Sequence, residues 1–282
     1  MATSRQPLLS IVVPVYNGMP YLKETLDSTL GQLTSDIQIV VRNNGSTDGT
    51  AAYLDSIQDP RVRVVHSDHT VSAGRNWSEV CRQATGTYTK VLCADDVVLP
   101  GGLDRQLTAA RAHPDAVAIA SRRQIIDEQG RVILRAHGLA GFVGRFDGAD
   151  VAKRAILKGT NPFGETSSAL FRTDVLLKEL PFTEDHPYLT DFDMFVRVLQ
   201  HGAFVGLDTV DGAFRVSSTS WSASIGASQL TQFRAWVNSL VERGILALSP
   251  AELRMMRARA RVMFIARQAV SVLAPFLGAF RR

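Results

Sequence analysis

The sequence predicts an α/β fold built on a mostly parallel central sheet. Between residues 8 and 121, short apolar runs rich in β-branched residues alternate with segments of helical periodicity. Strands that alternate with helices at this spacing form βαβ units, whose strands run parallel. The chain has 282 residues, of which 45% are apolar, so it can form one large domain with a sizeable core and is not globally disordered.

The first half of the chain is the more regular half. Leu22, Leu26 and Leu30 are spaced four apart and predict the apolar stripe of a helix. Thr47 or Asp48 is expected to cap the second helix, and Gly86 to close the third. Strands are expected at 8–16, 37–42, 62–66, 88–93 and 116–121, and helices at 20–30, 51–58, 72–86 and 101–114.

The pattern changes after residue 122. A hairpin turning near Gln129 and Gly130 is followed by a glycine-rich, loop-like stretch, and later strands would extend the sheet in antiparallel directions. We therefore expect one large domain over residues 1–225, with two halves at about 8–122 and 123–225. A helical extension is expected over residues 226–282. After the hairpin the sequence predicts a loop at 139–150, a helix at 150–158, a polar loop at 161–167, a strand at 168–172, a helix at 189–202 and a strand at 203–208.

Charge and cysteine content limit the kinds of binding partner and the cellular compartment that we expect. The net charge is +4, but residues 251–282 carry +6 and the rest of the chain −2, so a basic nucleic-acid-binding face is not expected. The polar N-terminal residues do not resemble a secretory signal, and two cysteines, Cys81 and Cys93, do not indicate a disulfide framework. These features favour a cytoplasmic protein. The sequence leaves the oligomeric state open.

Polar residues follow several of the predicted strands. Parallel sheets bind ligands beyond the carboxyl ends of their strands. Asp95 and Asp96 end the fourth strand at that edge, and such an oxygen-rich pair suits Mg²⁺ or Mn²⁺ bound together with phosphates. A solvated turn fits this segment alone equally well. The residues expected to converge at this edge are Tyr16, Asn17, Asn43, Asn44, Asp95 and Asp96.

Several segments together resemble the family-2 glycosyltransferases, which have the GT-A fold. The resemblance covers about residues 8–222, and six motifs occur in the family's order. It implies a Rossmann-like domain that binds a nucleotide-diphosphate sugar. The motifs are SIVVPVYNG, VVRNNGSTDGT, SAGRN, VLCADD, NPFGETSSALFR and LTDFDMFVRVLQHG.

The resemblance also implies a donor site. Pro14, Val15 and Tyr16 would line the base, and a tyrosine face can stack on it, although Tyr16 is equally a common strand-end aromatic. Asn43 stands where the family has an aspartate that reads a pyrimidine; an amide oxygen can accept the same N–H. Arg75 could reach the diphosphate, or it is a solvated helix residue.

In the implied cation site, Ala94 and Asp95 match the family's Asp-X-Asp-Asp element, and Asp95 would hold the cation, with Asp96 beside it. Cys93 replaces the first aspartate of that element. A neutral thiol is a poor ligand for Mg²⁺ or Mn²⁺, so Cys93 is expected to pack rather than to bind.

The resemblance places the reaction on the helix near residue 190. Asp191 would be the single base of an inverting transfer, which takes the proton of the acceptor hydroxyl. A helix N-cap is the alternative role. Asp193 and Glu165 are candidate acceptor contacts; the alternatives are a structural role for Asp193 and a solvated loop position for Glu165. Thr190 replaces the family's glutamate, and Ser217 a frequent histidine.

The sequence thus predicts a metal-dependent, inverting glycosyltransferase that moves one sugar from a UDP-sugar, or else a dTDP-sugar, to a glycan or lipid-linked acceptor, as in cell-envelope polysaccharide synthesis. The alternatives are a non-catalytic sugar-nucleotide-binding protein and a sugar nucleotidyltransferase. The segment 253–282 mixes arginines with apolar residues and could lie on an anionic membrane surface on the cytoplasmic side, or pack as a helix on the domain or in a dimer contact.

Overall fold

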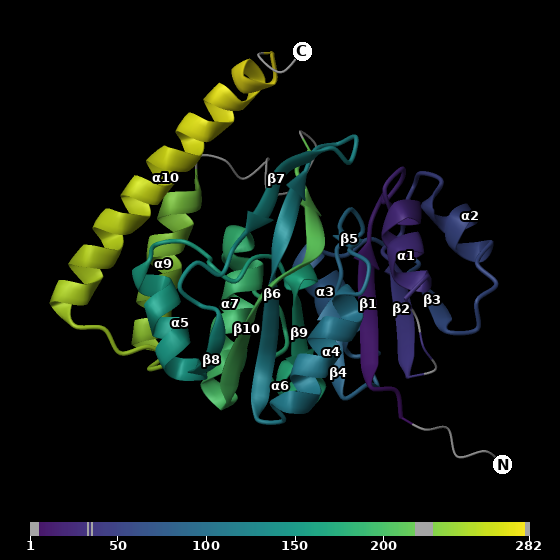
Figure 1. Cartoon of the computed structure of the whole chain (residues 1–282), viewed down its shortest axis with the longest axis horizontal. Coiled ribbons are helices and arrows are strands. Elements are labelled where there is room, and N and C mark those ends of the chain that lie inside the picture. The colour runs from purple at the N-terminus through teal and green to yellow at the C-terminus, as the bar shows by residue number, and fades with distance from the viewer. Residues whose placement is uncertain (1–5, 33, 35, 218–227, 280–282) are drawn as a thin grey trace.

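The computed structural model describes residues 6–32, 34, 36–217 and 228–279, and these fold around one ten-stranded sheet with helices on both faces (Figure 1). The strands are β1 (Leu9–Val15), β2 (Ile37–Asn43), β3 (Val62–His66), β4 (Tyr88–Val91), β5 (Val97–Val98), β6 (Ala116–Ile126), β7 (Val132–His137), β8 (Gly144–Asp147), β9 (Ala169–Arg172) and β10 (Ala203–Arg215).

The sheet has a parallel half and a mixed half. Its main order is β3-β2-β1-β4-β9-β6-β10-β5, with β7 beside β6 and β8 beside β10. The neighbours from β3 to β4 pair in parallel, as do β6 and β10, whereas β5, β7, β8 and β9 pair antiparallel. The predicted α/β class and the antiparallel extension are both confirmed.

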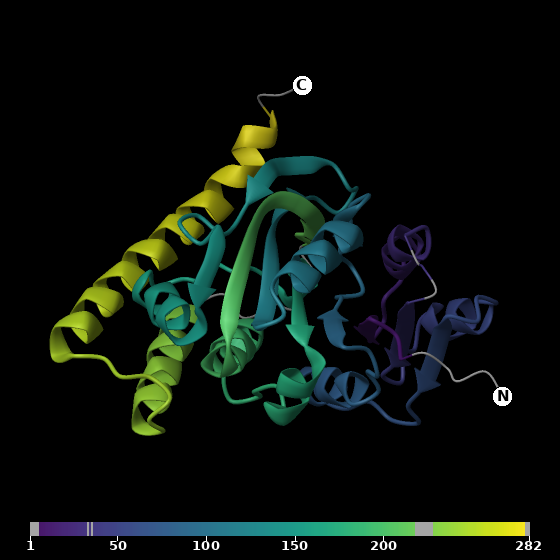
Figure 2. The same ribbon diagram turned by 60° about the horizontal axis from the view of Figure 1, so that its bottom comes forward.

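The helices cover the sheet on its two faces (Figures 1 and 2). Short 3₁₀ turns occur at Thr166–Ser168, Pro187–Leu189 and Leu199–His201. The α-helices are α1 (Leu22–Leu30), α2 (Thr50–Asp55), α3 (Ala73–Cys81), α4 (Gly102–Ala112), α5 (Gly148–Leu157), α6 (Thr173–Lys178), α7 (Thr190–Val198), α9 (Gln229–Glu242) and α10 (Pro250–Ala279).

Successive side chains of β1 point to opposite faces of the sheet and so contribute to two hydrophobic cores. Ile11 and Val13 are fully buried on the face that α1 and α4 cover, and Val12 is fully buried on the opposite face. A strand buried on both faces reads as a continuous apolar run, which is why this segment predicted a central strand. The core around Val12 continues into Phe163, Phe192 and the helices of the second half.

Some predicted boundaries and caps were wrong. The third helix ends at Cys81, not at Gly86. Gly86 instead lies against β1, where an added Cβ would come 2.7 Å from the backbone nitrogen of Ser10. At α2 the N-cap is Gly49, while Asp48 accepts a hydrogen bond from the Thr50 backbone at 2.9 Å. Asp48 therefore stabilises that helix start from one position further out.

The second half contains more regular structure than predicted. Part of the stretch expected to be a loop at 139–150 is β8, and β5 and α6 were not foreseen. The strand expected at 203–208 continues to Arg215 as β10, and the strand expected at 116–121 continues to Ile126 as β6. The hairpin expected near Gly130 is present, and Gly130 has the positive φ of 76° that a tight turn requires.

The helical extension shares the core of the body. Trp236 of α9 is 1% exposed and lies 5.0 Å from Phe192 of α7, measured between ring centroids. In α10, Met256 and Ala260 are buried. Among the described residues, no helix combines the length and the apolar content that crossing a membrane requires. The first part of the predicted extension is thus an integral part of the packing.

Candidate active site

The loops after β1 and β2 are joined side by side at the carboxyl edge of the sheet. Asn17, with a positive φ of 49°, donates its backbone N–H to the Ser46 hydroxyl at 2.9 Å, and its side-chain oxygen accepts from the Thr47 backbone at 2.8 Å. Gly18 donates to the Thr50 hydroxyl at 2.9 Å. These bonds hold the first two sequence motifs as one surface.

The residues predicted to contact the base differ in how exposed their side chains are. Tyr16 is 52% exposed and offers its ring at the end of β1, whereas Pro14 and Val15 are buried within the strand. Asn43 is 3% exposed; its side-chain oxygen accepts from the Ser46 backbone at 3.1 Å and its amide nitrogen lies 3.1 Å from His66 Nδ1. The Asn43 side chain therefore stabilises the turn that follows β2.

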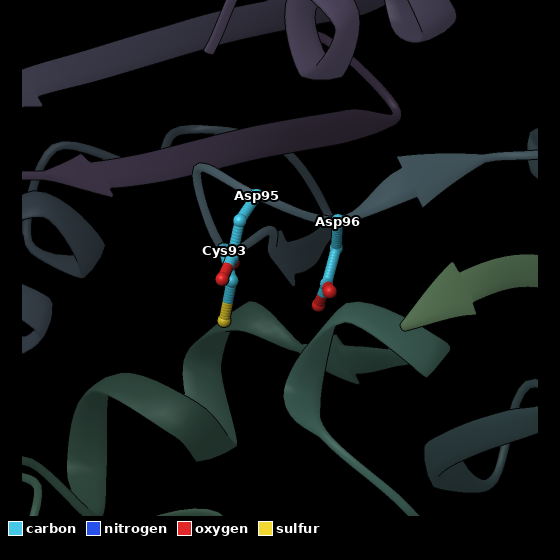
Figure 3. A group of neighbouring side chains, drawn as sticks. All are labelled: Cys93, Asp95 and Asp96. Carbon is cyan, nitrogen blue, oxygen red and sulfur yellow. The ribbon is translucent and has the colours of Figure 1, made fainter. Parts of the chain in front are cut away.

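Three side chains gather after β4, as Figure 3 shows: one ligand atom each from Cys93, Asp95 and Asp96 lies within 4.8 Å of the others. Asp96 is fully buried, and its Oδ2 accepts no hydrogen bond. Burial, with the nearby Asp95 charge, raises the pKa of Asp96 well above its usual range. Burial likewise raises the pKa of Asp95, with a further contribution from Glu165.

This group suits a hard divalent cation. Buried carboxylates with raised pKa values lack a counter-charge, and an orphaned buried carboxylate oxygen costs free energy unless something positive or a donor meets it. Burial also raises the pKa of the Cys93 thiol well above its usual value, which keeps the sulfur protonated. Asp95 and Asp96 would therefore hold Mg²⁺ or Mn²⁺, and Cys93 would not.

Arg215, at the end of β10, holds the loop that carries these acids. Its side chain is 1% exposed, and its Nε donates to the Asp95 carbonyl at 2.9 Å. Its backbone N–H donates to Asp96 Oδ1 at 3.1 Å. The guanidinium also donates to the Asp127 carbonyl at 3.1 Å and to Glu24 at 2.6 Å, and it lies over the Tyr21 ring.

Asp191 is the second residue of α7, and its charge is close enough to Cys93 to contribute to the raised pKa of that thiol. Its Oδ1 is buried without a hydrogen bond. Burial, with the nearby Glu165 charge, raises the pKa of Asp191 to about 7, against the lowering effects of Arg123 and a Thr166 backbone hydrogen bond. The helix begins at Thr190 after Leu189 as N-cap, without a side-chain capping bond. The alternative role of Asp191 as an N-cap is therefore wrong.

Glu165 is not a solvated loop acid. It pairs with Arg123 of β6, whose side chain is 6% exposed. Gly138 and Gly164 both have positive φ, and an added Cβ at either would lie 2.5 Å from Arg123 Nη1. These two glycines leave room for the buried guanidinium, which in turn directs Glu165 toward the acid cluster.

Two predicted residues lie apart from this cluster. Asp193 is 3% exposed, and its carboxylate accepts from Arg197 Nε at 2.8 Å and from Trp236 Nε1 at 2.8 Å, an arrangement that matches the structural alternative. Arg75 pairs with Glu79 at 2.8 Å on α3. Within the described residues, no contact joins Arg75 to Asp95 or Asp191.

Sequence reasoning did not single out Arg123 or Ser167. Ser167, in the 3₁₀ turn before β9, accepts the Cys93 backbone N–H at 3.0 Å and so joins the polar loop to the acid cluster. A charged residue inside an apolar strand, as Arg123 is in β6, was the available signal. Residues 218–222, the last part of the stretch that resembles the family, lie outside the described residues.

Comparison with known proteins supports these observations. Residues 10–179 match the family model described as Glycosyl transferase family 2. An uncharacterized glycosyltransferase of Haemophilus influenzae is 24% identical over 208 residues, which cover 70% of this chain and 61% of that protein. A hyaluronan synthase of Pasteurella multocida is 25% identical over 209 residues, covering 73% of this chain and 20% of the synthase.

Two solved structures share the fold. S. aureus TarS 1-349 in complex with UDP-GlcNAc superposes with a TM-score of 0.66 at 16% identity, covering 89% of this chain and 71% of that one. The mannosyltransferase PcManGT from Pyrobaculum calidifontis, in complex with GDP-Man and Mn²⁺, superposes with a TM-score of 0.61 at 16% identity, covering 98% and 83%. At these identities, the likeness establishes the GT-A fold.

Proposed function

The chain belongs to glycosyl transferase family 2, and from this membership we propose that it transfers one sugar from a nucleotide-diphosphate donor to a hydroxyl of a glycan or glycolipid acceptor, with inversion. The observation that carries the proposal is the position of Asp191. Asp191 is a buried carboxylate whose pKa is raised to about 7, and its charge also raises the pKa of Cys93, which lies with Asp95 and Asp96 in the acid cluster.

Asp191 would act as the base. A general base is most effective when its pKa lies near the working pH, because it is then both ionised and basic enough to accept a proton. As the acceptor oxygen attacks the anomeric carbon, its proton would pass to the unpartnered Asp191 Oδ1. One base suffices for this transfer, whereas a glycoside hydrolase needs two carboxyl groups across the bond.

Asp95 and Asp96 would hold the cation that the donor diphosphate needs. A divalent cation bound there would offset the charge that develops on the departing diphosphate. Arg215 fixes both acids through the Asp95 carbonyl and Asp96 Oδ1, so their oxygens are in place before the donor arrives. Glu165, held by Arg123, would contact acceptor hydroxyls.

Tyr16 and Asn43 bear on which donor base is bound. The exposed Tyr16 ring supports stacking on a base, which every nucleotide offers. The buried Asn43 has its amide engaged by Ser46 and His66, so it supports pyrimidine reading less than an exposed acid would. We infer a UDP-sugar first and a dTDP-sugar second, and a direct comparison must include GDP-sugars. Arg75 could reach the diphosphate only by leaving Glu79.

The C-terminal helix could also bring the protein to a membrane. Met256 and Ala260 pack on the body, while Val262 is 63% exposed and Ile265 is 58% exposed on the same helix. Four exposed arginines lie among them: Arg254, Arg257, Arg259 and Arg261. We infer that this stretch can lie on an anionic surface that carries a lipid-linked acceptor. The side chains from residue 267 onward lie outside the described part.

A donor screen combined with one variant tests the proposal. Thermal stability is measured with UDP-, dTDP- and GDP-sugars, each with and without Mn²⁺, because a ligand that binds only the native state raises its apparent stability. We expect one donor class to stabilise the protein only with Mn²⁺.

Asp191→Asn should keep that donor-induced shift and lose sugar transfer by about 10²–10⁴-fold. The matched control is Asp104→Asn, which changes an exposed acid on α4 and should have no effect. Donor-dependent stabilisation without transfer in the wild type, over a broad acceptor panel, would favour a non-catalytic binding protein. Synthesis of the donor from a sugar phosphate and a nucleoside triphosphate would favour a nucleotidyltransferase.

A further inference from the structure

The strand β7 exposes apolar side chains on both of its faces. Val132 is 45% exposed, Ile133 58% and Leu134 44%. Successive residues of a strand point to opposite faces, so three consecutive exposed residues leave neither face covered. β7 pairs only with β6 among the described strands, and its outer edge is free. Such an edge is a binding surface unless something covers it.

The charges around this strand favour an anionic partner. The segment from Arg131 to His137 contains two arginines, one histidine and no acid. Arg131 is 75% exposed and forms a salt bridge with Asp127 at 2.7 Å. Arg135 is exposed and has no ion-pair partner among the described residues. Apolar side chains bracketed by arginines are the pattern that inserts into the interface of an anionic bilayer.

A second copy of the chain fits this edge less well. Antiparallel pairing of two β7 strands that aligns their apolar residues is centred on Ile133. In that register, Arg131 of each copy stands opposite Arg135 of the other, twice in the same interface. Like charges directly opposite each other across a strand pair are destabilising. A surface of anionic head groups has no such conflict.

The hairpin lies on the side of the molecule where the candidate site is found. In Figure 1, the β6–β7 hairpin extends beyond the upper end of the sheet, where β1 ends and the loop after it begins. Gly130 at the hairpin turn lies beside Arg215, whose Nη1 would be 3.8 Å from an added Cβ. A surface that holds the hairpin would therefore lie close to Arg215, which holds the loop of the acid cluster.

We propose that the exposed face of β7 (Val132, Ile133 and Leu134, with Arg131 and Arg135) is a membrane-docking surface that inserts its apolar residues into an anionic lipid interface. This surface is separate from the C-terminal helix, and the proposal does not depend on sugar transfer. It gives the chain a second point of contact with a bilayer, on the side where a lipid-linked acceptor would be presented.

Vesicle sedimentation of the full chain tests the proposal. The probes are phosphatidylglycerol-containing vesicles and pure phosphatidylcholine vesicles, at low and high salt. We expect binding to the anionic vesicles that weakens with salt, because exposed charges are screened. Ile133→Asp should reduce that binding by about tenfold or more, since it removes an inserted aliphatic side chain and adds a negative charge.

The control is Leu177→Asp on α6, which changes a side chain of 36% exposure at the other end of the sheet and should leave binding unchanged (Figure 1). Arg135→Gln should weaken binding only to anionic vesicles. Thermal melting and the nucleotide-induced stability shift of each variant show whether fold and donor site are intact. Unchanged binding by Ile133→Asp, or no binding by the wild type, would overturn the proposal. Loss of a dimer in Ile133→Asp, seen by sedimentation equilibrium, would assign the edge to a second copy instead.

Discussion

Asp191 shows how burial and neighbouring charges adjust the pKa of a single carboxylate. Its pKa is raised to about 7 first by burial and then by the Glu165 charge, while Arg123 opposes the shift. As a base, Asp191 must be ionised, so transfer should increase about tenfold per pH unit below 7 and level off above it. The measurement is kcat/KM across the pH range at saturating cation.

Glu165→Gln should move this profile to lower pH. The substitution removes the charge that raises the Asp191 pKa and leaves Arg123, which lowers it. Asp104→Asn, an exposed and remote change, should leave the profile in place. A profile that stays fixed in Glu165→Gln would mean that another group limits the rate.

The same residue should reduce stability. The folded pKa of Asp191 exceeds the unfolded value of 3.8, so the folded protein binds the extra proton between about pH 4 and 7. The free energy of unfolding therefore decreases as pH rises through that window. Asp191→Asn should raise the free energy of unfolding by up to about 4 kcal/mol at pH 8 and change it little near pH 4. Denaturant unfolding at both pH values measures this; an equal gain at both would point to packing instead.

Arg215 should contribute more to stability than other arginines. Its replacement by glutamine would leave the buried carbonyls of Asp95 and Asp127 without their donor, at a cost of about 3 kcal/mol. Arg172→Gln is the matched control, because its partner Asp174 is 65% exposed and such pairs contribute less than about 1 kcal/mol. Similar midpoints for both variants in urea would contradict this account.

At the scale of elements, the parallel half was predictable and the mixed half only in part. Each strand from β1 to β3 is rich in β-branched residues and is followed by a helix, so local pattern and fold agree. β5 has two residues, Val97 and Val98, and forms only because β10 lies beside it. β8 is formed by Gly144–Asp147, a polar, glycine-containing segment whose strand character likewise comes from pairing with β10. Long-range pairing of this kind leaves no local signal.

The residues of the candidate site also differ in whether the sequence alone could identify them. Asp95 and Asp96 were identifiable because motif and strand end coincide, and the fold groups them with Cys93. Asp191 was identifiable because it lies in a motif at the start of a helix. Arg123 was not, because its role depends on Gly138 and on the adjacent Gly164 and Glu165, which meet it from two separate segments. Asp193 shows the opposite error: it lies in a family motif, yet its carboxylate faces Arg197 and Trp236.

The link between α7 and α9 gives a prediction for that pair of elements. Asp193→Asn should destabilise the protein by about 3 kcal/mol, because it removes the nearer carboxylate partner of the buried Arg197 guanidinium, at 2.8 Å, and leaves Glu179 at 3.6 Å. It should leave the acceptor KM of the folded fraction unchanged. The comparison variant Trp236→Phe should cost about 1–3 kcal/mol, since only a hydrogen bond is lost. A specific increase in acceptor KM would restore the acceptor role of Asp193.

At the scale of the whole molecule, the helical extension behaves as part of one unit. Phe233 and Trp236 of α9 and Met256 of α10 belong to the same core as Phe192 of α7. Truncation after residue 227 should therefore expose this core and produce aggregation or loss of cooperative unfolding. Truncation after residue 266 keeps those contacts and should preserve the melting temperature. An intact, soluble protein ending at residue 227 would show that the extension is an independent addition.

The buried Arg215 guanidinium bonds at once to the turn of the β6–β7 hairpin, through the Asp127 carbonyl, and to the Asp95 carbonyl in the loop of the acid cluster. A displacement at one end is therefore opposed by the bonds at the other. If lipid contact and donor binding favour the same arrangement of this link, each ligand increases the affinity for the other by the same factor, because binding linkage is reciprocal. The enzyme would then hold its donor more tightly on a bilayer than in free solution, and a bound sugar nucleotide would lengthen its residence on the membrane.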